Sequence, residues 1–177
     1  MIRAVTMLLA GALLLLVMAL AGAAVVASTV DPELAGRKLA FPVQGHDPRK
    51  LRDNFAERRG GHPHEALDIM AKRGTPVVAV EDGRVAKLFK SDAGGLTIYQ
   101  FDPSERYAYY YAHLEGYAKG LAEGARVRRG EVIGYVGSSG NAQPEAPHLH
   151  FTIFRLGPDR KWWKGTAINP FPYLAAK

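Results

Sequence analysis

The chain of 177 residues is long enough for one compact domain and one appended segment, and 47% of its residues are apolar. It contains no cysteine, which excludes disulfide bonds, thiolate metal ligands and a lipidated N-terminal cysteine. The formal net charge of +6 suits an anionic polymer as a partner, although a basic surface can equally serve solubility alone.

The first 30 residues are strongly apolar. No charged residue occurs between Ala4 and Val30, and Arg3 is the only charged side chain ahead of this run. Such a segment is typical of a signal peptide or of a membrane anchor, and as a helix it could span a bilayer of ~30 Å. We therefore predict an exported cell-envelope protein, periplasmic or, if the segment stays uncleaved, anchored to the cytoplasmic membrane and facing outward. Export favours a cell-wall polymer over nucleic acid as the anionic partner.

The rest of the chain reads as a linker at residues 31–39 followed by one domain at residues 40–177. Asp47 and Pro48 are typical of a helix start, and we predict one short helix that includes Leu51 and Phe55. Beyond it, short β-prone segments alternate with glycine turns. The predicted strands are 75–80, 84–90, 96–101, 106–113, 131–136 and 148–155, with a further helix at 114–121. This pattern indicates a mainly β fold, a small antiparallel β-sandwich or open barrel.

Histidines and a carboxylate lie in two stretches that are far apart in the chain, His64 to Asp68 and His148 to His150. Residues i and i+2 of a strand face the same way, so His148 and His150 can both face one site. Catalytic zinc usually has three protein ligands and an open fourth position, and His64, Asp68 and His150 meet this requirement. Spacing alone does not decide between His148 and His150. His62 forms another i, i+2 pair with His64, but the intervening proline favours a loop, and we expect His62 not to bind metal.

Residues 107–113 read Tyr-Ala-Tyr-Tyr-Tyr-Ala-His. In a strand, Tyr107, Tyr109, Tyr111 and His113 share one face. Such a stripe could form one rim of a substrate groove, with Tyr109 and Tyr111 lining it. The alternative is that the tyrosines merely cover the sheet and that His113 is a surface residue.

Two adjacent tryptophans, Trp162 and Trp163, lie between Lys161 and Lys164. They could line the groove or touch lipid headgroups at a membrane surface. The simplest interpretation is that they pack beneath the C-terminal residues 168–174.

Three motifs, taken in their order along the chain, resemble the M23 family of zinc metallopeptidases, the lysostaphin and LytM type. They are His64-x-x-x-Asp68, Tyr111-Ala112-His113-Leu114 and Pro147-His148-Leu149-His150-Phe151. The resemblance covers roughly residues 40–173. It implies a small antiparallel β domain with an open active-site groove, and peptide bonds of peptidoglycan stems or cross-bridges as the substrate.

The same resemblance implies a role for each polar residue of these motifs. One Zn²⁺ ion would be held by His64, Asp68 and His150, while His113 and His148 would be catalytic residues that do not bind metal. One of these two would act as, or assist, the general base, and the other would stabilise the oxyanion.

Two features depart from the family pattern. Ala66 stands where many relatives have glycine, and the loop at residues 138–146 is more polar and more proline-bearing than usual. Neither removes a catalytic atom, but both affect the shape of the groove and so the preferred cross-link. An alternative function is a non-catalytic envelope regulator that activates other wall hydrolases through a protein partner. A cytoplasmic phosphocarrier of sugar transport is disfavoured by the apolar N-terminus and by Asp68.

Overall fold

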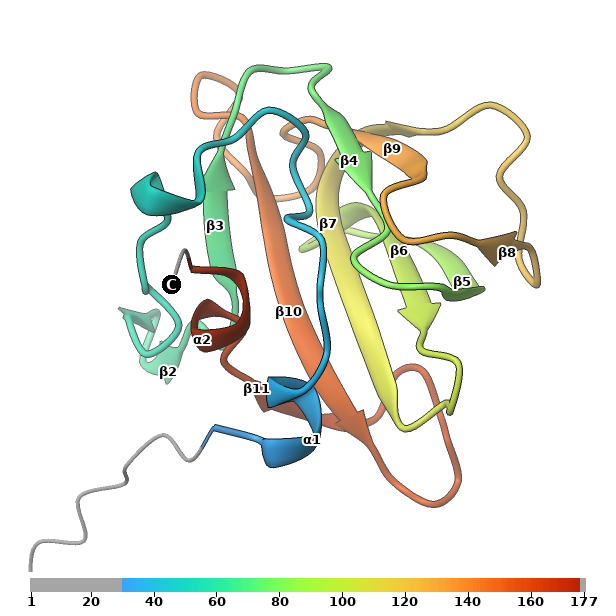
Figure 1. Ribbon diagram of the computed structural model, residues 1–177. Helices are drawn as coiled ribbons and strands as arrows, with labels where there is room; N and C mark the ends of the chain where they lie inside the picture. Colours follow the sequence, from blue (N-terminus) through green and yellow to red (C-terminus); the bar gives the residue numbers. More distant parts are fainter. Residues whose placement is uncertain (1–29, 176–177) are drawn as a thin grey trace, which may run out of the picture.

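The computed structural model describes residues 30–175 (Figure 1). Within this range nine strands form one sheet and two more form a separate small sheet. In chain order the elements are α1 (Pro32–Ala35), the 3-10 helix η1 (Pro48–Lys50), β1 (Arg58–Arg59), β2 (His62–Pro63), β3 (Leu67–Met70), β4 (Pro76–Val78), β5 (Gly83–Ser91), β6 (Gly95–Phe101), β7 (Tyr107–Tyr117), β8 (Arg126–Val127), β9 (Val132–Val136), β10 (His148–Leu156), β11 (Gly165–Ile168) and α2 (Phe171–Leu174).

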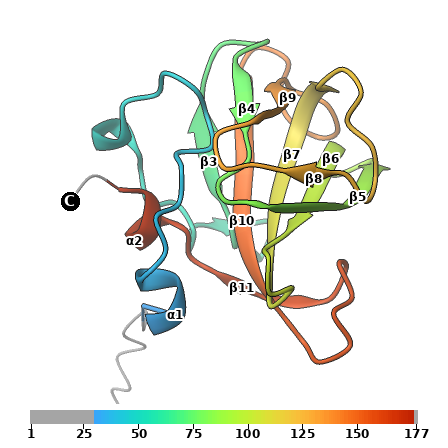
Figure 2. The ribbon, with the colours of Figure 1, turned by 45° about the vertical axis from the view of Figure 1, so that its right-hand side comes forward.

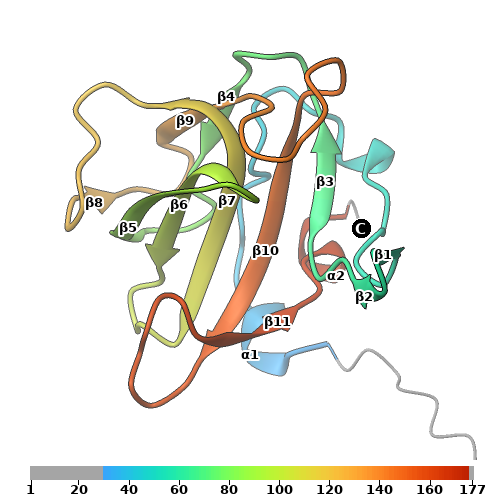
Figure 3. The same cartoon turned by 180° about the vertical axis from the view of Figure 1, so that it is seen from behind.

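The strands of the main sheet run in the order β11-β10-β7-β6-β5-β8, and every pairing is antiparallel. β3 pairs with the first half of β10 and β11 with its second half, so both lie along the same edge of β10 (Figure 3). β4 and β9 pair with each other, and β9 also pairs with the C-terminal end of β7 (Figure 2). The sheet does not close on itself within the described residues. The mainly β, antiparallel fold predicted from the sequence is confirmed.

The hydrophobic core lies on one face of β10, β7 and β6. Alternate residues of these strands are fully buried there, among them Tyr109 and Tyr111 of β7, Phe151 and Ile153 of β10, and Ile98 of β6. Because successive side chains of a strand point to opposite faces, the residues between them point away from the core. The even-numbered histidines of β10 therefore lie on the outer face of the sheet.

The six predicted strands are all present, with ends that differ from the prediction by at most four residues. The helix predicted at residues 114–121 is wrong, because β7 continues to Tyr117, where it pairs with Gly134 of β9. Ladder hydrogen bonds from a partner strand outweigh the weak helix propensity of this segment. The helix predicted after Asp47 shortens to η1, whose first turn is capped as expected by the Asp47 side chain, which accepts from the Arg49 N–H.

The residues predicted to be a linker, 31–39, are instead a packed part of the domain. Asp31 caps α1 by accepting from the N–H groups of Glu33 and Leu34, and Leu34 is fully buried in the core. The buried Asp31 carboxylate also accepts from the Tyr107 hydroxyl at 3.0 Å. The hydrophobic helix predicted for the N-terminus lies outside the described residues, apart from Val30. None of the helices at residues 30–175 is long and apolar enough to cross a membrane.

Candidate metal centre

His64, Asp68 and His150 bring one ligand atom each to a single point. His64 Nε2 lies 3.1 Å from Asp68 Oδ1 and 3.2 Å from His150 Nδ1, and the last two atoms are also 3.2 Å apart. In a tetrahedral zinc site with bonds of about 2.0 Å, neighbouring ligand atoms are about 3.3 Å apart. The three atoms therefore form one face of a tetrahedron of the size that zinc requires, and the residues fit this metal.

Sheet register places two of the three ligands. β3 pairs with β10 so that Asp68 lies directly opposite His150, and opposed residues of paired strands face the same way. The third ligand, His64, precedes β3 by a short turn in which Glu65 has φ +57°. This left-handed conformation is strained for a non-glycine residue, and such strain concentrates at functional sites. It turns the chain so that His64 faces back toward Asp68.

Asn54 forms hydrogen bonds with two of the ligand residues, His64 and Asp68. The Nδ1–H of His64 donates to the main-chain carbonyl of Asn54 at 3.1 Å, so in the neutral ring Nε2 is the nitrogen whose lone pair can bind a metal. The side-chain oxygen of Asn54 accepts from the main-chain N–H of Asp68 at 3.2 Å. Sequence analysis missed Asn54, because an asparagine in a loop ten residues before His64 carries no signal of its own.

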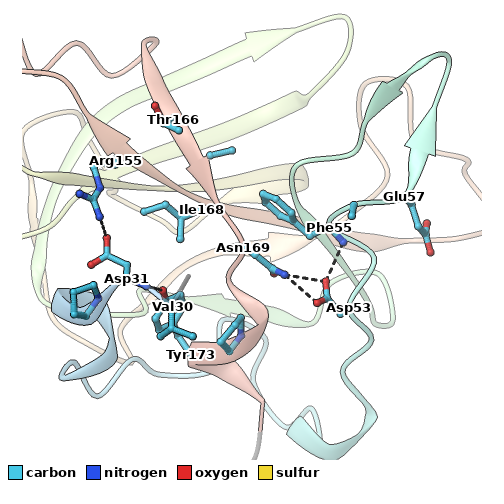
Figure 4. Close-up of a pocket in the computed structure, with 14 residues that line it drawn as sticks. Val30, Asp31, Asp53, Phe55, Glu57, Arg155, Thr166, Ile168, Asn169 and Tyr173 are labelled. Atoms are coloured by element: carbon cyan, nitrogen blue, oxygen red, sulfur yellow. Dashed lines mark hydrogen bonds and ion pairs between the residues drawn. The ribbon is translucent and has the colours of Figure 1, made fainter. Parts of the chain in front are cut away.

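The loop that carries Asn54 is anchored at a cavity of about 1080 Å³ between α1, α2 and β11 (Figure 4). Asn169 Nδ2 donates to both carboxylate oxygens of Asp53, at 3.1 and 2.9 Å, and Asp53 accepts from the N–H of Phe55. On the opposite wall, Arg155 pairs with Asp31. The contacts of Asp53 with Asn169 and Phe55 hold the loop in place.

Asp68 supplies the negative charge of the ligand group. Burial alone would raise the pKa of the Asp68 carboxyl, but the adjacent side chains of His150, His64 and Arg59 outweigh burial and hold that pKa far below its usual range. The Arg59 guanidinium donates from Nη1 to Asp68 Oδ2 at 2.6 Å, and the same nitrogen lies 3.1 Å from His64 Nε2. The carboxylate is therefore ionised, and it attracts a cation. Sequence analysis did not identify Arg59.

His113 and His148 lie side by side next to the three ligands. Their ring centroids are 4.9 Å apart, and His148 Nε2 is 3.6 Å from Asp68 Oδ1. Each ring donates its Nδ1–H to a main-chain carbonyl, His113 to Ser139 at 2.8 Å and His148 to Ala146 at 2.9 Å. In the neutral rings Nε2 is therefore the nitrogen that can accept a proton. Burial lowers the pKa of His113 to about 4, so its ring is neutral at pH 7.

A β-bulge brings His113 to this side of the sheet. Pairing between β6 and β7 passes from Ile98↔Tyr111 to Leu96↔Leu114, so β7 carries one extra residue, and His113 has φ +58°. The ring of His113 contacts His150, whereas Tyr111 packs on Phe151 in the core. The prediction that His113 shares a face with Tyr111 is therefore wrong.

The prediction that Tyr109 and Tyr111 line a substrate groove is also wrong, because both have 0% of their surface exposed. The Tyr109 hydroxyl donates to Glu81 at 2.6 Å and the Tyr111 hydroxyl to Gln100 at 2.7 Å. Both side chains belong to the core.

A cleft of about 370 Å³ opens beside the ligand group. Asp68, His113 and His148 line one side of it, and residues 141–146 form the other. Ser139 fixes the base of this loop by donating to the Leu114 carbonyl at 2.7 Å and accepting from the Leu96 N–H at 2.9 Å. The polar loop noted in the sequence is thus one wall of the site. His62, which is exposed, is not part of the ligand group.

Comparison with known proteins identifies the family. The model for peptidase family M23 matches residues 62–170. An L-Ala–D-Glu endopeptidase of Bacillus subtilis is 34% identical over 145 residues, which cover 77% of this chain and 43% of that protein. The murein hydrolase activator NlpD of Salmonella typhimurium is 27% identical over 83% of this chain and 36% of that protein. This chain thus spans less than half the length of either relative.

A solved structure shows the same fold. The structure of lytM from Ruminococcus gnavus superposes with a TM-score of 0.66 at 28% identity, covering 80% of this chain and 61% of that chain. With the family match over most of the sheet and over all three ligand positions, the chain belongs to peptidase family M23.

Proposed function

We propose that this protein is a zinc-dependent endopeptidase that hydrolyses peptide bonds in peptidoglycan stems or cross-links. The observation that carries the proposal is the triangle of ligand atoms from His64, Asp68 and His150, with two further histidines beside it. Membership of family M23 supports the reaction class, and the B. subtilis relative, named as an endopeptidase, supports the substrate class.

The three ligands supply what a catalytic site for zinc needs. Asp68 is ionised, and the hydrogen bond to Asn54 selects the His64 tautomer in which Nε2 carries the lone pair. A zinc ion held by these residues would act as a Lewis acid that polarises the scissile carbonyl and lowers the pKa of a water molecule to about 7. Three protein ligands would leave a fourth coordination position for water or substrate.

His113 would accept a proton during the reaction, and His148 would stabilise negative charge. Burial keeps His113 neutral, so its Nε2 can accept a proton from the attacking water. We assign His148 to the oxyanion, because its Nε2 lies beside the ligand group, 3.6 Å from Asp68 Oδ1, and a proton on Nε2 would let the ring donate to the oxyanion. The main-chain carbonyls that accept from both Nδ1–H groups hold the two rings in these orientations.

We infer that the protein acts in the cell envelope, where peptidoglycan lies. The net charge of +6 suits an anionic wall polymer. The apolar N-terminal segment, as a cleaved signal or a retained anchor, accounts for export.

Muropeptide analysis by mass spectrometry tests the proposal. Purified peptidoglycan is incubated with the zinc-loaded wild type and, in parallel, with His150→Ala. We expect new peptide ends with the wild type alone. If the zinc-loaded wild type produces no new ends, the protein is not this enzyme.

A second candidate function is activation of another wall hydrolase, which the similarity to NlpD favours. All five residues expected for catalysis are present in this chain, which argues for the enzyme. The two functions separate in one assay that combines this protein with a purified amidase. A regulator would raise the amidase rate and generate no peptide ends of its own.

A further inference from the structure

The outer face of the sheet carries a row of aromatic rings that starts at the metal centre. Tyr110 of β7 meets His150 edge-on with ring centroids 6.0 Å apart. Tyr99 of β6 lies opposite Tyr110 in the strand register, at 4.6 Å between ring centroids. Trp162 follows at 4.8 Å from Tyr99, and Trp163 at 5.3 Å from Trp162. With Phe89 of β5, which lies 5.4 Å from Trp162, these five residues form the aromatic strip.

The strip is a surface and not an extension of the core. Trp163 is 62% exposed and Phe89 is 39% exposed, while Tyr99, Tyr110 and Trp162 are half-buried. The two tryptophans come from the loop between β10 and β11. Trp162 packs at a tilt against Phe89 and Tyr99 of the sheet. This replaces the packing beneath the C-terminal residues that the sequence predicts as the simplest arrangement. Exposed aromatic rings joined in this way mark a binding surface.

Two lysines lie at the outer end of the strip, and one of them, Lys161, also pairs with Asp159 at 3.6 Å. The Lys161 ammonium lies 5.7 Å from the centre of the Trp163 ring, and the exposed Lys164 follows Trp163 directly. A ligand that matches this surface has flat apolar faces, and it carries negative charge nearby.

We propose that the aromatic strip binds the glycan strand of peptidoglycan, with hexosamine rings stacked on Trp162 and Trp163; this rests on the proposed function. A pyranose ring presents an apolar C–H face to an aromatic ring and keeps its hydroxyl groups in water. The carboxylates of the attached peptides supply the negative charge that the lysines match.

Continuity with the metal centre favours this ligand over others. A stem peptide is joined to a sugar of the strand, and an extended peptide advances only ~3.3 to 3.6 Å per residue. A glycan therefore lies within a few residues of any bond that is cut in the stem. A strip that begins at Tyr110, beside His150, and ends at Trp163 would hold the sugars while the peptide crosses the ligand group. A lipid surface would need no such row leading to the metal centre.

Binding of a peptide-free sugar tests the inference directly. Chitohexaose, an oligomer of N-acetylglucosamine, is titrated into the full chain, and tryptophan fluorescence and calorimetry report binding. We expect a change in tryptophan fluorescence, and we expect Trp163→Ala to weaken binding at least about fivefold, the equivalent of ~1 kcal/mol from one lost stacking contact. Tyr135→Ala is the matched control, because Tyr135 is an exposed aromatic residue of β9 outside the strip.

A second pair of measurements separates this inference from the proposed function. His150→Ala should no longer hydrolyse peptidoglycan but should still bind chitohexaose. If the variant still hydrolyses peptidoglycan, the proposed function is wrong. If it no longer binds chitohexaose, the inference about the glycan is wrong. On intact peptidoglycan Trp163→Ala should raise KM and leave kcat unchanged, and on a glycan-free stem peptide it should change neither.

Two results would overturn the inference. One is equal affinity of the wild type and Trp163→Ala for chitohexaose, or absence of binding to both. The other is binding of the wild type to phosphatidylglycerol vesicles, lost in Trp163→Ala, without any binding of the sugar. That second result would assign the strip to a membrane surface.

Discussion

The two faces of β7 use the same kind of side chain for opposite purposes. Tyr109 and Tyr111 point inward, have no exposed surface, and donate their hydroxyls to Glu81 and Gln100. Tyr110, between them, points outward, meets His150 edge-on and begins the aromatic strip. Strand alternation separates a structural face from a functional face within three consecutive residues. Substitutions on the outer face should change chemistry, and those on the inner face should change stability.

His113 shows that this alternation has one exception at the site itself. Counting by twos from Tyr111 places His113 on the core face, but the bulge and its φ of +58° move the side chain to the outer face. One extra residue in β7 thus adds a histidine to a group that β3 and β10 otherwise supply. Bulges commonly aim a side chain at an active site.

The largest expected effect comes from removing a ligand on the outer face. His150→Ala should lose bound zinc and reduce peptidoglycan cleavage by roughly 10⁴-fold or more, because the entire metal contribution disappears. Zinc content is measured by atomic absorption on the purified protein. His62→Ala, at an exposed histidine outside the ligand group, is the control and should keep both zinc and activity. Loss of zinc in that control would mean that the ligand set is wrong.

His113→Ala should separate catalysis from metal binding. We expect stoichiometric zinc and a drop in kcat of about 10²- to 10⁴-fold, the usual contribution of a general acid or base. Paired zinc and turnover measurements on one preparation check this. A zinc-free His113→Ala protein would show that His113 is a ligand.

On the inner face, Tyr111→Phe should destabilise the fold by about 1 to 3 kcal/mol with kcat unchanged. The Tyr111 hydroxyl donates to Gln100 and accepts from the Val80 N–H at 3.1 Å, and both buried groups would lose their partner. Urea unfolding measures the difference. Tyr110→Phe, the neighbour on the outer face, should change stability by less than about 0.5 kcal/mol. Equal effects of the two substitutions would contradict the division between the faces.

The smallest effect concerns Arg59, whose guanidinium donates to Asp68 and lies 3.1 Å from His64 Nε2. A lone pair of His64 Nε2 cannot serve Arg59 and a metal at once, so zinc must displace this contact. Arg59→Ala should therefore raise zinc affinity roughly fivefold, since a half-exposed ion pair contributes up to ~1 kcal/mol. Competition with a chromophoric chelator measures the change, and Arg58→Ala serves as the matched control. Weaker zinc binding in Arg59→Ala would mean that Arg59 supports the site.

Local patterns in the sequence predicted much of the fold. Glycine turns separate the six predicted strands, and the i, i+2 spacing correctly places His148 and His150 on the same face, because steric alternation acts within a few residues. The same reasoning failed at residues 114–117, where the hydrogen bonds of β9 extend β7, and at residues 31–39, where a buried leucine joins a distant core. Asn54 and Arg59 were missed because their contacts with the ligands depend on how a loop and a short hairpin fold against β3.

Stretches of a few residues determine which ligand types are present, where they lie on the strands and which face of β10 points outward. The register between strands that are far apart in the chain decides which face His113 occupies. It also places Asp68 directly opposite His150. The same holds for the packing of Trp162 against Tyr99 within the strip. Register is set by hydrogen bonds and packing across the sheet, and a single extra residue reverses every side chain that follows it. Short-range pattern therefore determines the chemistry available to this protein, and the pairing of distant strands determines where that chemistry is assembled.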